Sequence, residues 1–309
     1  MRYSQVGVAL LSVMFILTLL TTFAVYMVEE DHLLLRRAQN QRTITQGTQL
    51  AFGSEQWAAR VIQRDLKLSK TDHLGEDWNK LGSPVSVNDG KLRTTITDLH
   101  SRFNLNNLSS RDKVWYPAFK RLLRLLELDE TLVEAIVDWI DSDQQRTHAG
   151  GAEDLEYQLN DPPYRAANQS MADLGELLYV QGFTAEIVEL LAPFVTVIPN
   201  AKVTKINVNT CPPLLLQILG DQMTAADAES LANARGETGF ESIEIFLQRP
   251  ELAGEANVTA EPMISLSSEF FQINSQVSID RLGLNMESIV TRNAARESVS
   301  VISRKRGYL

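Results

Sequence analysis

The sequence contains very little cysteine, and Cys211 is the only one in 309 residues. A single thiol cannot form a disulfide within its own chain, so the fold must be held together by packing, hydrogen bonds or a bound metal. Composition is otherwise ordinary for a globular protein, with 44% hydrophobic and 22% charged residues. The chain is therefore expected to fold, with two or three subdomains at this length.

The common signatures of catalysis are also missing. No serine lies in a G-x-S-x-G turn, and no G-x-x-x-x-G-K-[ST] loop is present to bind phosphates. The histidines form neither an H-E-x-x-H motif nor a pair; they are His32, His73, His100 and His148. These absences argue against an enzyme, and a membrane-anchored hydrolase that uses paired carboxylates stays the less favoured alternative.

Positive charge is scarce in one part of the chain. The formal net charge is −10, and the segment from Asp129 to Asp161 contains ten acidic residues but a single basic residue, Arg146. Such a concentration of acids repels the phosphates of nucleic acids. The segment is therefore expected to form either a solvated surface or a cation site.

By contrast, a long hydrophobic run is present, and no charged residue occurs between Tyr3 and Val28. Roughly 21 residues at 1.5 Å per residue span about 30 Å, the thickness of a bilayer core. We therefore expect residues 8–28 to form one transmembrane helix that anchors a large soluble head. A cleaved secretory signal is the alternative, but this run exceeds the roughly 7–15 residues of a signal sequence and no small-x-small cleavage site follows it.

A short polar leader, MRYSQVG, occupies residues 1–7 and ends in Gly7. It resembles the leader of type IV prepilins, which a dedicated peptidase removes after the glycine on the cytoplasmic side. The resemblance implies cleavage between Gly7 and Val8, N-methylation of Val8, and retention of the hydrophobic helix.

The fifth mature position, counted from Val8, is Ser12, whereas most pilins and pseudopilins carry a glutamate there. In an assembled pilus that buried carboxylate neutralises the N-terminal amine of the subunit ahead. A subunit without the carboxylate has no amine ahead of it to neutralise. Ser12 therefore indicates a subunit at the tip.

Local patterns beyond the membrane segment predict an α+β protein. Apolar residues at helical spacing continue the first helix over residues 29–70. Alternating residues on either side of Asp89-Gly90 predict a β-hairpin, so residues 71–108 are assigned to the first strands of a sheet. Residues 109–202 have the periodicity of helices.

The C-terminal part of the chain returns to strand patterns. Alternating runs at 264–266, 270–278 and 298–303 predict that strands within residues 261–309 complete the sheet, with turns at Gly283 and Asn285. The sheet is therefore expected to be interrupted by a helical insertion.

Residues 203–260 predict a second small helical module that resembles a helix-hairpin-helix or SAM-like unit. Some such modules bind DNA phosphates through glycine-rich hairpins, which leaves a membrane-anchored DNA receptor as an alternative. This hairpin, however, reads LGDQM around Gly220, with an acid and few flanking bases. Packing or contact with a protein partner is the favoured interpretation.

The acidic loop contains the most specific candidate site. Asp141 and Asp143 are two residues apart, and Glu153 and Asp154 follow two glycines. Calcium prefers six to eight oxygen ligands, which such loops supply through carboxylates and backbone carbonyls. The spacing is not that of an EF-hand, and His148 lacks a partner at zinc-ligand spacing. From the residues alone, a calcium site and a merely solvated loop both remain open.

Several ordered segments together resemble the K-type minor pseudopilin of bacterial type II secretion systems, over almost the entire chain. Besides the leader and Ser12, they are ITDLHSRFNLNNL (96–108), DWIDSDQQ (138–145), GGAEDLEY (150–157), PPYRAANQSMADLGEL (162–177) and INVNTCPPLL (206–215). The resemblance implies a pseudopilin fold, in which a long N-terminal helix packs on an antiparallel sheet that carries a large inserted α-helical domain. It also implies calcium in the acidic loop, with Asp141, Asp143, Glu153 and Asp154 as side-chain ligands.

The resemblance further implies the role and location of the protein. Such a subunit is a single-pass protein of the bacterial inner membrane with its head in the periplasm. It starts and caps the tip of a short pseudopilus that drives folded proteins through the outer membrane. The expected partners are the I-type and J-type minor pseudopilins, the prepilin peptidase and the inner-membrane assembly platform, and nucleic acid is not among them.

Overall fold

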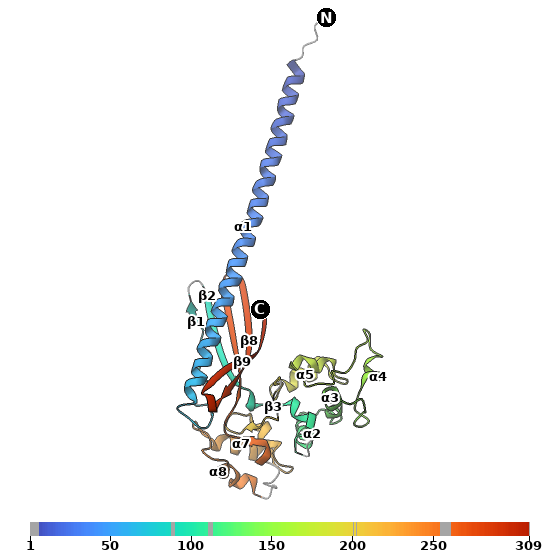
Figure 1. Ribbon diagram of the computed structural model, residues 1–309, viewed down its shortest axis with the longest axis vertical. Coiled ribbons are helices and arrows are strands. Elements are labelled where there is room, and N and C mark those ends of the chain that lie inside the picture. The colour runs from blue at the N-terminus through green and yellow to red at the C-terminus, as the bar shows by residue number, and fades with distance from the viewer. Residues whose placement is uncertain are drawn as a thin grey trace.

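The computed structural model describes residues 6–87, 90–110, 114–199, 201, 203–253 and 261–308. Its longest element is α1 (Val6–Asp65), a single helix of 60 residues. At 1.5 Å per residue this helix is about 90 Å long. Its N-terminal half projects away from the rest of the molecule, and its C-terminal part lies on a sheet (Figure 1).

The sheet has five antiparallel strands in the order β1-β2-β7-β8-β9. These strands are β1 (Val85–Val87), β2 (Gly90–Asp98), β7 (Phe270–Ile279), β8 (Leu282–Asn293) and β9 (Ser298–Tyr308). β2 pairs with β7 in a register that places Gly90 opposite Ile279 and Asp98 opposite Phe271. Strands far apart in the sequence thus lie side by side, which confirms the predicted insertion.

Apolar side chains of α1 pack against the sheet. Ala51, Ala58 and Ile62 are fully buried, and the last two share a core with Trp78 and Phe271. Burial of such apolar surface contributes roughly 25 cal/mol per Å². The C-terminal part of α1 is therefore a structural element of the head.

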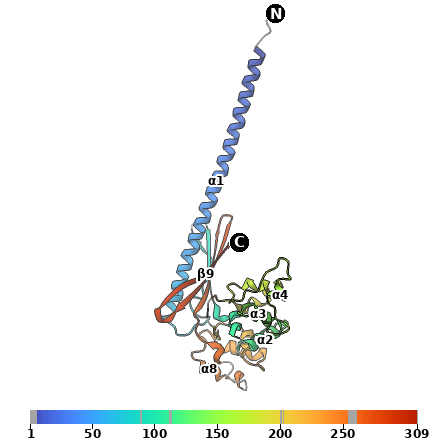
Figure 2. The ribbon, with the colours of Figure 1, turned by 45° about the vertical axis from the view of Figure 1, so that its right-hand side comes forward.

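The insertion between β2 and β7 is mainly helical. Its helices are α2 (Trp115–Leu125), α3 (Leu132–Ile140), α4 (Asp154–Tyr157), α5 (Ala185–Leu191), α6 (Pro213–Gln217), α7 (Ala225–Ala234) and α8 (Ile243–Leu247), and its short parallel strand pairs are β3 (Phe103–Asn104) with β4 (Val195–Thr196) and β5 (Ile206–Asn207) with β6 (Ile264–Ser265). Buried side chains from Phe103 to Leu266 form one continuous core. The segments 109–202 and 203–260 thus pack together, at the end of the molecule opposite the N-terminus (Figures 1 and 2).

Buried polar side chains join the sheet to the insertion. Asp98, at the end of β2, accepts hydrogen bonds from Thr210 Oγ1 (2.6 Å) and Ser268 Oγ (2.7 Å) through Oδ2. Asn107 likewise exchanges two hydrogen bonds with the backbone of Thr204 through its side-chain amide. These contacts satisfy polar groups that would otherwise be buried at a cost.

Three local predictions need correction. Gly283 and Asn285 lie within β8, and the turn that joins β7 to β8 falls at Asp280, whose φ is 50°. The pairing of both edges of β8, with β7 and with β9, outweighs the turn preference of glycine and asparagine. Residues 264–265 pair with β5 and are not part of the main sheet, and β2 ends at Asp98, well before Leu108. The β1–β2 hairpin is confirmed, although Asp89 of its predicted turn lies outside the described residues.

Candidate functional site

The N-terminal half of α1 is an unpartnered apolar surface. It is long and apolar enough to cross a membrane, and none of its most apolar stretch is buried by the other described residues. Val8 is 68% exposed, and Ser12 Oγ donates a hydrogen bond to the Val8 carbonyl at 2.9 Å. The Ser12 hydroxyl is therefore satisfied within its own helix. Residues 1–5 of the predicted leader lie outside the described residues.

The acidic loop connects α3 to α4, and its carboxylates converge. Asp141 follows the last residue of α3, and Glu153 directly precedes α4. One oxygen each from Asp141, Asp143 and Glu153 lies within 4.8 Å of the other two. The fold thus brings together three of the four residues that the sequence predicts as ligands.

Hydrogen bonds that the loop donates to buried acids on α3 fix its position. Asp138 is fully buried and accepts hydrogen bonds from the backbone and hydroxyl of Thr147. Glu134 Oε2 accepts a hydrogen bond from Gly150 N at 2.9 Å. These two acids lie four residues apart on one helix face, so they hold two points of the loop against α3.

Arg146, the single base in the segment, connects residues 149–151 of the loop to Glu156 of α4. Its guanidinium donates to the carbonyls of Ala149 (3.1 Å) and Gly151 (2.9 Å), and it forms an ion pair with Glu156 at 3.1 Å. The acidic loop is therefore held by hydrogen bonds to α3 and within the loop itself.

The fourth predicted ligand, Asp154, is engaged elsewhere. Its Oδ1 accepts a hydrogen bond from Ala166 N at 3.1 Å, and its Oδ2 lies 3.8 Å from Arg165 Nε. Asp154 is not part of the group that brings Asp141, Asp143 and Glu153 together. Its position suits a role in attaching residues 165–166 to the start of α4.

Glu153 is the most perturbed acid of the loop. Its residue is 4% exposed, and within the described part of the chain neither of its carboxylate oxygens has a hydrogen-bond partner. Burial, and then the nearby carboxylates of Asp138, Asp141 and Asp143, raise the pKa of Glu153 to about 7. An ionised group in this setting requires a positive partner, and a hard cation with oxygen ligands fits the donor set.

Two buried acids that position the loop, Asp138 and Glu134, are not identified from the sequence. Asp138 and Glu134 read as polar positions of an amphipathic helix, yet they are buried at 0% and 6% exposure. The signal that could have found Asp138 is its position three residues before Asp141, which puts both on one side of the helix end.

The hairpin between α6 and α7 has the wrong charge for DNA. Asp221 lies in this hairpin and is 80% exposed at its side chain, where it pairs with Arg121 of α2. The acid is thus used to attach the hairpin to the neighbouring helix. The charge at this hairpin opposes contact with phosphates.

Comparison with known proteins identifies the family. Family models for type II secretion system protein K match residues 101–200 and 206–267. Type II secretion system protein K of Pseudomonas aeruginosa is 33% identical over 293 residues, which cover 90% of this chain and 86% of that protein. The chain belongs to the type II secretion system protein K family. The Klebsiella pneumoniae protein K is 32% identical over 323 residues, which cover 99% of this chain and 98% of the relative.

The fold agrees with a solved member of the protein K family. The crystal structure of the GspK-GspI-GspJ complex from the enterotoxigenic Escherichia coli type 2 secretion system contains a chain that matches with a TM-score of 0.79 and 26% identity. The match covers 88% of this chain and 99% of that one. This protein K is therefore a minor pseudopilin with the predicted α+β fold, and the comparisons do not support a DNA receptor.

Proposed function

We propose that this protein K initiates and caps the tip of a periplasmic pseudopilus for the export of folded proteins. The single observation that carries the proposal is its similarity to a chain that was crystallised with GspI and GspJ. By analogy, its partners are the I-type and J-type minor pseudopilins. It acts as a structural subunit and not as an enzyme.

Two features of the chain support a tip position. Ser12 places no carboxylate in the apolar layer, so the helix has no group to neutralise the amine of a subunit ahead of it. The helical insertion lies at the end opposite the N-terminus, beyond the sheet (Figure 2). Its bulk would obstruct a further subunit stacked above the head.

The N-terminal helix supports a membrane-anchored state of the subunit before it is assembled. A prepilin peptidase would cleave between Gly7 and Val8 and methylate Val8. The helix would then anchor the subunit in the inner membrane, with the head in the periplasm, until the assembly platform inserts it into the pilus. The exposed apolar surface of α1 fits both lipid and neighbouring pilin helices.

The acidic loop would bind calcium, with Asp141, Asp143 and Glu153 as side-chain ligands. The buried carboxylate of Glu153, whose oxygens have no hydrogen-bond partner among the described residues, supports this assignment. Calcium would supply positive charge and oxygen coordination that hold α3 to α4. Asp154 would contribute by orienting the start of α4.

Co-purification tests the tip assignment. The full-length chain is expressed with tagged I-type and J-type pseudopilins, and we expect it to be recovered with them from detergent extracts. Ser12→Glu should reduce recovery because the new carboxylate has no amine to pair with in the apolar layer, whereas the matched control Ser12→Ala should not. Recovery of the wild-type chain with neither partner would contradict the proposal.

A further inference from the structure

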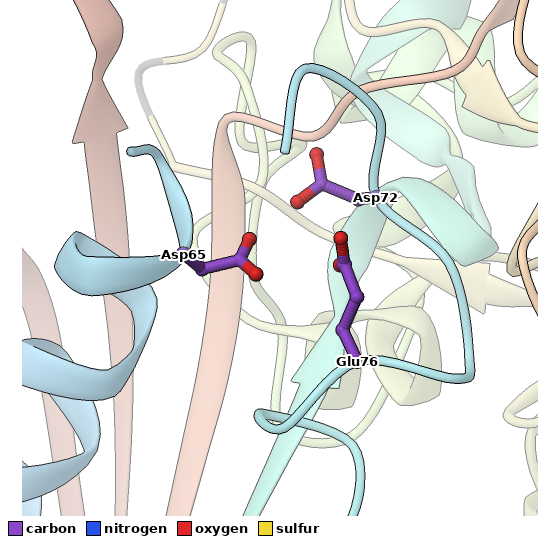
Figure 3. A group of neighbouring side chains, drawn as sticks. All are labelled: Asp65, Asp72 and Glu76. Carbon is purple, nitrogen blue, oxygen red and sulfur yellow. The ribbon is translucent and has the colours of Figure 1, made fainter. Parts of the chain in front are cut away.

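A second group of carboxylates lies where the sheet, α1 and the insertion meet. Asp65 is the last residue of α1, and Asp72 and Glu76 lie in the connection between α1 and β1. One oxygen of each lies within 4.8 Å of the other two. Figure 3 shows the three carboxylates pointing toward a common centre.

This group is buried, and some of its carboxylate oxygens have hydrogen-bond donors while others have none in the part of the chain that the structure describes. The Asp72 side chain is 2% exposed, and its Oδ2 accepts hydrogen bonds from Arg292 and from Ser268 N, which lies at 2.7 Å. Among the described residues, Asp72 Oδ1 and Glu76 Oε1 have no hydrogen-bond partner. Buried carboxylate oxygens are rarely left in this state, because each loses its hydration without compensation.

The charges at this centre do not balance. Arg292 faces both aspartates, with its Nη1 at 3.1 Å from Asp65 Oδ2, and its side chain is 6% exposed. Of the described arginines and lysines, only Arg292 is in ion-pair contact with the three carboxylates, which leaves an excess of two negative charges around them when all three are ionised. Burial, and then repulsion from Glu76 and Asp72, raise the pKa of Asp65 to about 7.

The other polar groups around Glu76 are donors and add no ligand. Trp78 Nε1 (2.6 Å) and His73 N (3.2 Å) both donate to Glu76 Oε2. His73 Nδ1 accepts a hydrogen bond from Gly75 N, so a neutral ring carries its proton on Nε2, which lies 3.6 Å from Glu76 Oε1. The available ligand atoms are therefore carboxylate oxygens only.

We propose that Asp65, Asp72 and Glu76 form a second cation site, which takes a hard divalent ion, calcium. Two positive charges match the excess negative charge, and oxygen-only donors exclude a preference for softer metals. Asp65 and Glu76 line a cavity of about 720 Å³, which gives the ion an entry path and room for coordinated water. This site is separate from the acidic loop and uses none of its residues.

A cation here would brace the junction between the pilin helix and the head. Asp72 N donates to the Leu266 carbonyl at 2.7 Å, and its own carbonyl accepts from Asn207 Nδ2 at 3.1 Å. The ion would thus connect the end of α1 to β5 and to Leu266, which directly follows β6. Movement of the insertion relative to the helix would be restricted by its binding.

Counting bound calcium tests the proposal. The detergent-purified full-length chain is equilibrated with radioactive calcium, and Glu76→Gln is expected to bind one ion fewer per chain than the wild type. Asp77→Asn is the matched control, because Asp77 is adjacent and its side chain is 78% exposed, and it should bind the wild-type number. An equal count in wild type and Glu76→Gln would overturn the proposal.

Two further variants separate this site from the acidic loop and from misfolding. Glu153→Gln affects only the loop, so Glu76→Gln must lower the count in that background as well as in the wild type. Asp65→Asn provides an independent removal of one ligand, and circular dichroism establishes that each variant is folded. In the Glu153→Gln background, where the acidic loop no longer binds, terbium at the second site should emit on excitation of Trp78, and this emission should be lost with Glu76→Gln but not with Asp77→Asn. Terbium emission that persists in that background with both Glu76→Gln and Asp65→Asn would also contradict the assignment.

Discussion

At the scale of single residues, Glu153 controls the proposed calcium site. Its carboxylate is buried among other acids without a hydrogen-bond donor in the described chain, so the folded state without cation is strained electrostatically. A ligand that binds only the folded state stabilises it by about 2.7 kcal/mol at a concentration 100 times its dissociation constant.

Replacement of Glu153 is therefore expected to remove the share of calcium-dependent stability that the acidic loop contributes. For the wild type, the melting temperature should fall by several degrees when a chelator is added, because the loop acids then repel one another. In the Glu76→Gln background, which removes the second proposed site, Glu153→Gln should show the same melting temperature with calcium and with chelator. Glu189→Gln, an exposed position on α5 of the same insertion, should retain the wild-type response. A chelator that leaves the wild-type melt unchanged would refute calcium binding.

Gly151 is the residue whose size matters most to the loop. A Cβ at this position would lie 2.0 Å from Asp138 Oδ2, a contact that the buried aspartate cannot relieve without losing its hydrogen bonds to Thr147. Gly151→Ala should therefore destabilise the chain by about 2 kcal/mol, measured by thermal unfolding. Gly53→Ala is the matched control, since a Cβ there meets nothing within 4 Å and alanine favours helix by about 1 kcal/mol. Equal effects of the two substitutions would contradict the loop geometry.

At the scale of secondary-structure elements, Glu55 connects α1 to the edge strand β9. Its side chain is 3% exposed, and Arg304 Nε and Nη2 donate to its two oxygens at 2.7 and 2.9 Å. Burial raises the pKa of Glu55, and hydrogen bonds from Arg304 and Ser288 outweigh that effect, so its pKa lies below the ordinary value of 4.5. The pair stabilises the fold above pH 4.5, and this contribution is lost as the pH falls through the lowered pKa.

Arg304→Ala should lower stability by about 2 kcal/mol at pH 7. Breaking a fully buried pair costs about 3–5 kcal/mol, and the cost is smaller here because solvent screens Arg304, whose side chain is 47% exposed. The loss should shrink as the pH is lowered below 4.5, since protonated Glu55 no longer needs the arginine. Arg306→Ala, an exposed position two residues along β9, is the control in the same thermal melts. A loss that is independent of pH would contradict the ion-pair explanation.

The sequence predicts those elements whose signals are local. The β1–β2 hairpin follows from a short-range pattern, the alternating residues on either side of Asp89-Gly90. β8 was missed because Gly283 and Asn285 resemble turn residues, and its strand state depends on two neighbouring strands. Longer-range signals of this type cannot be recovered from one sequence.

The same distinction applies to the candidate sites. Asp141, Asp143 and Glu153 were predicted because glycines and acids lie close together in one loop. Asp65 and Arg292 meet only after the chain has passed through the whole insertion. No spacing in the sequence indicates that contact, so the second group of carboxylates could be found only in the folded molecule.

At the scale of the whole molecule, an apolar rod, which is the exposed N-terminal half of α1, extends from a large head (Figure 1). Family membership establishes a minor pseudopilin. The tip function depends on keeping the rod in the mature protein, because the rod is the surface through which pilin subunits would pack. Removal of the rod as a signal sequence would leave a head without an anchor.

The mass of the intact protein extracted from membranes tests this account most directly. We predict a chain that lacks residues 1–7, begins at Val8 and carries one added methyl group. A mature chain that begins beyond Val28 would contradict the account, since the helix on which assembly depends would then be absent.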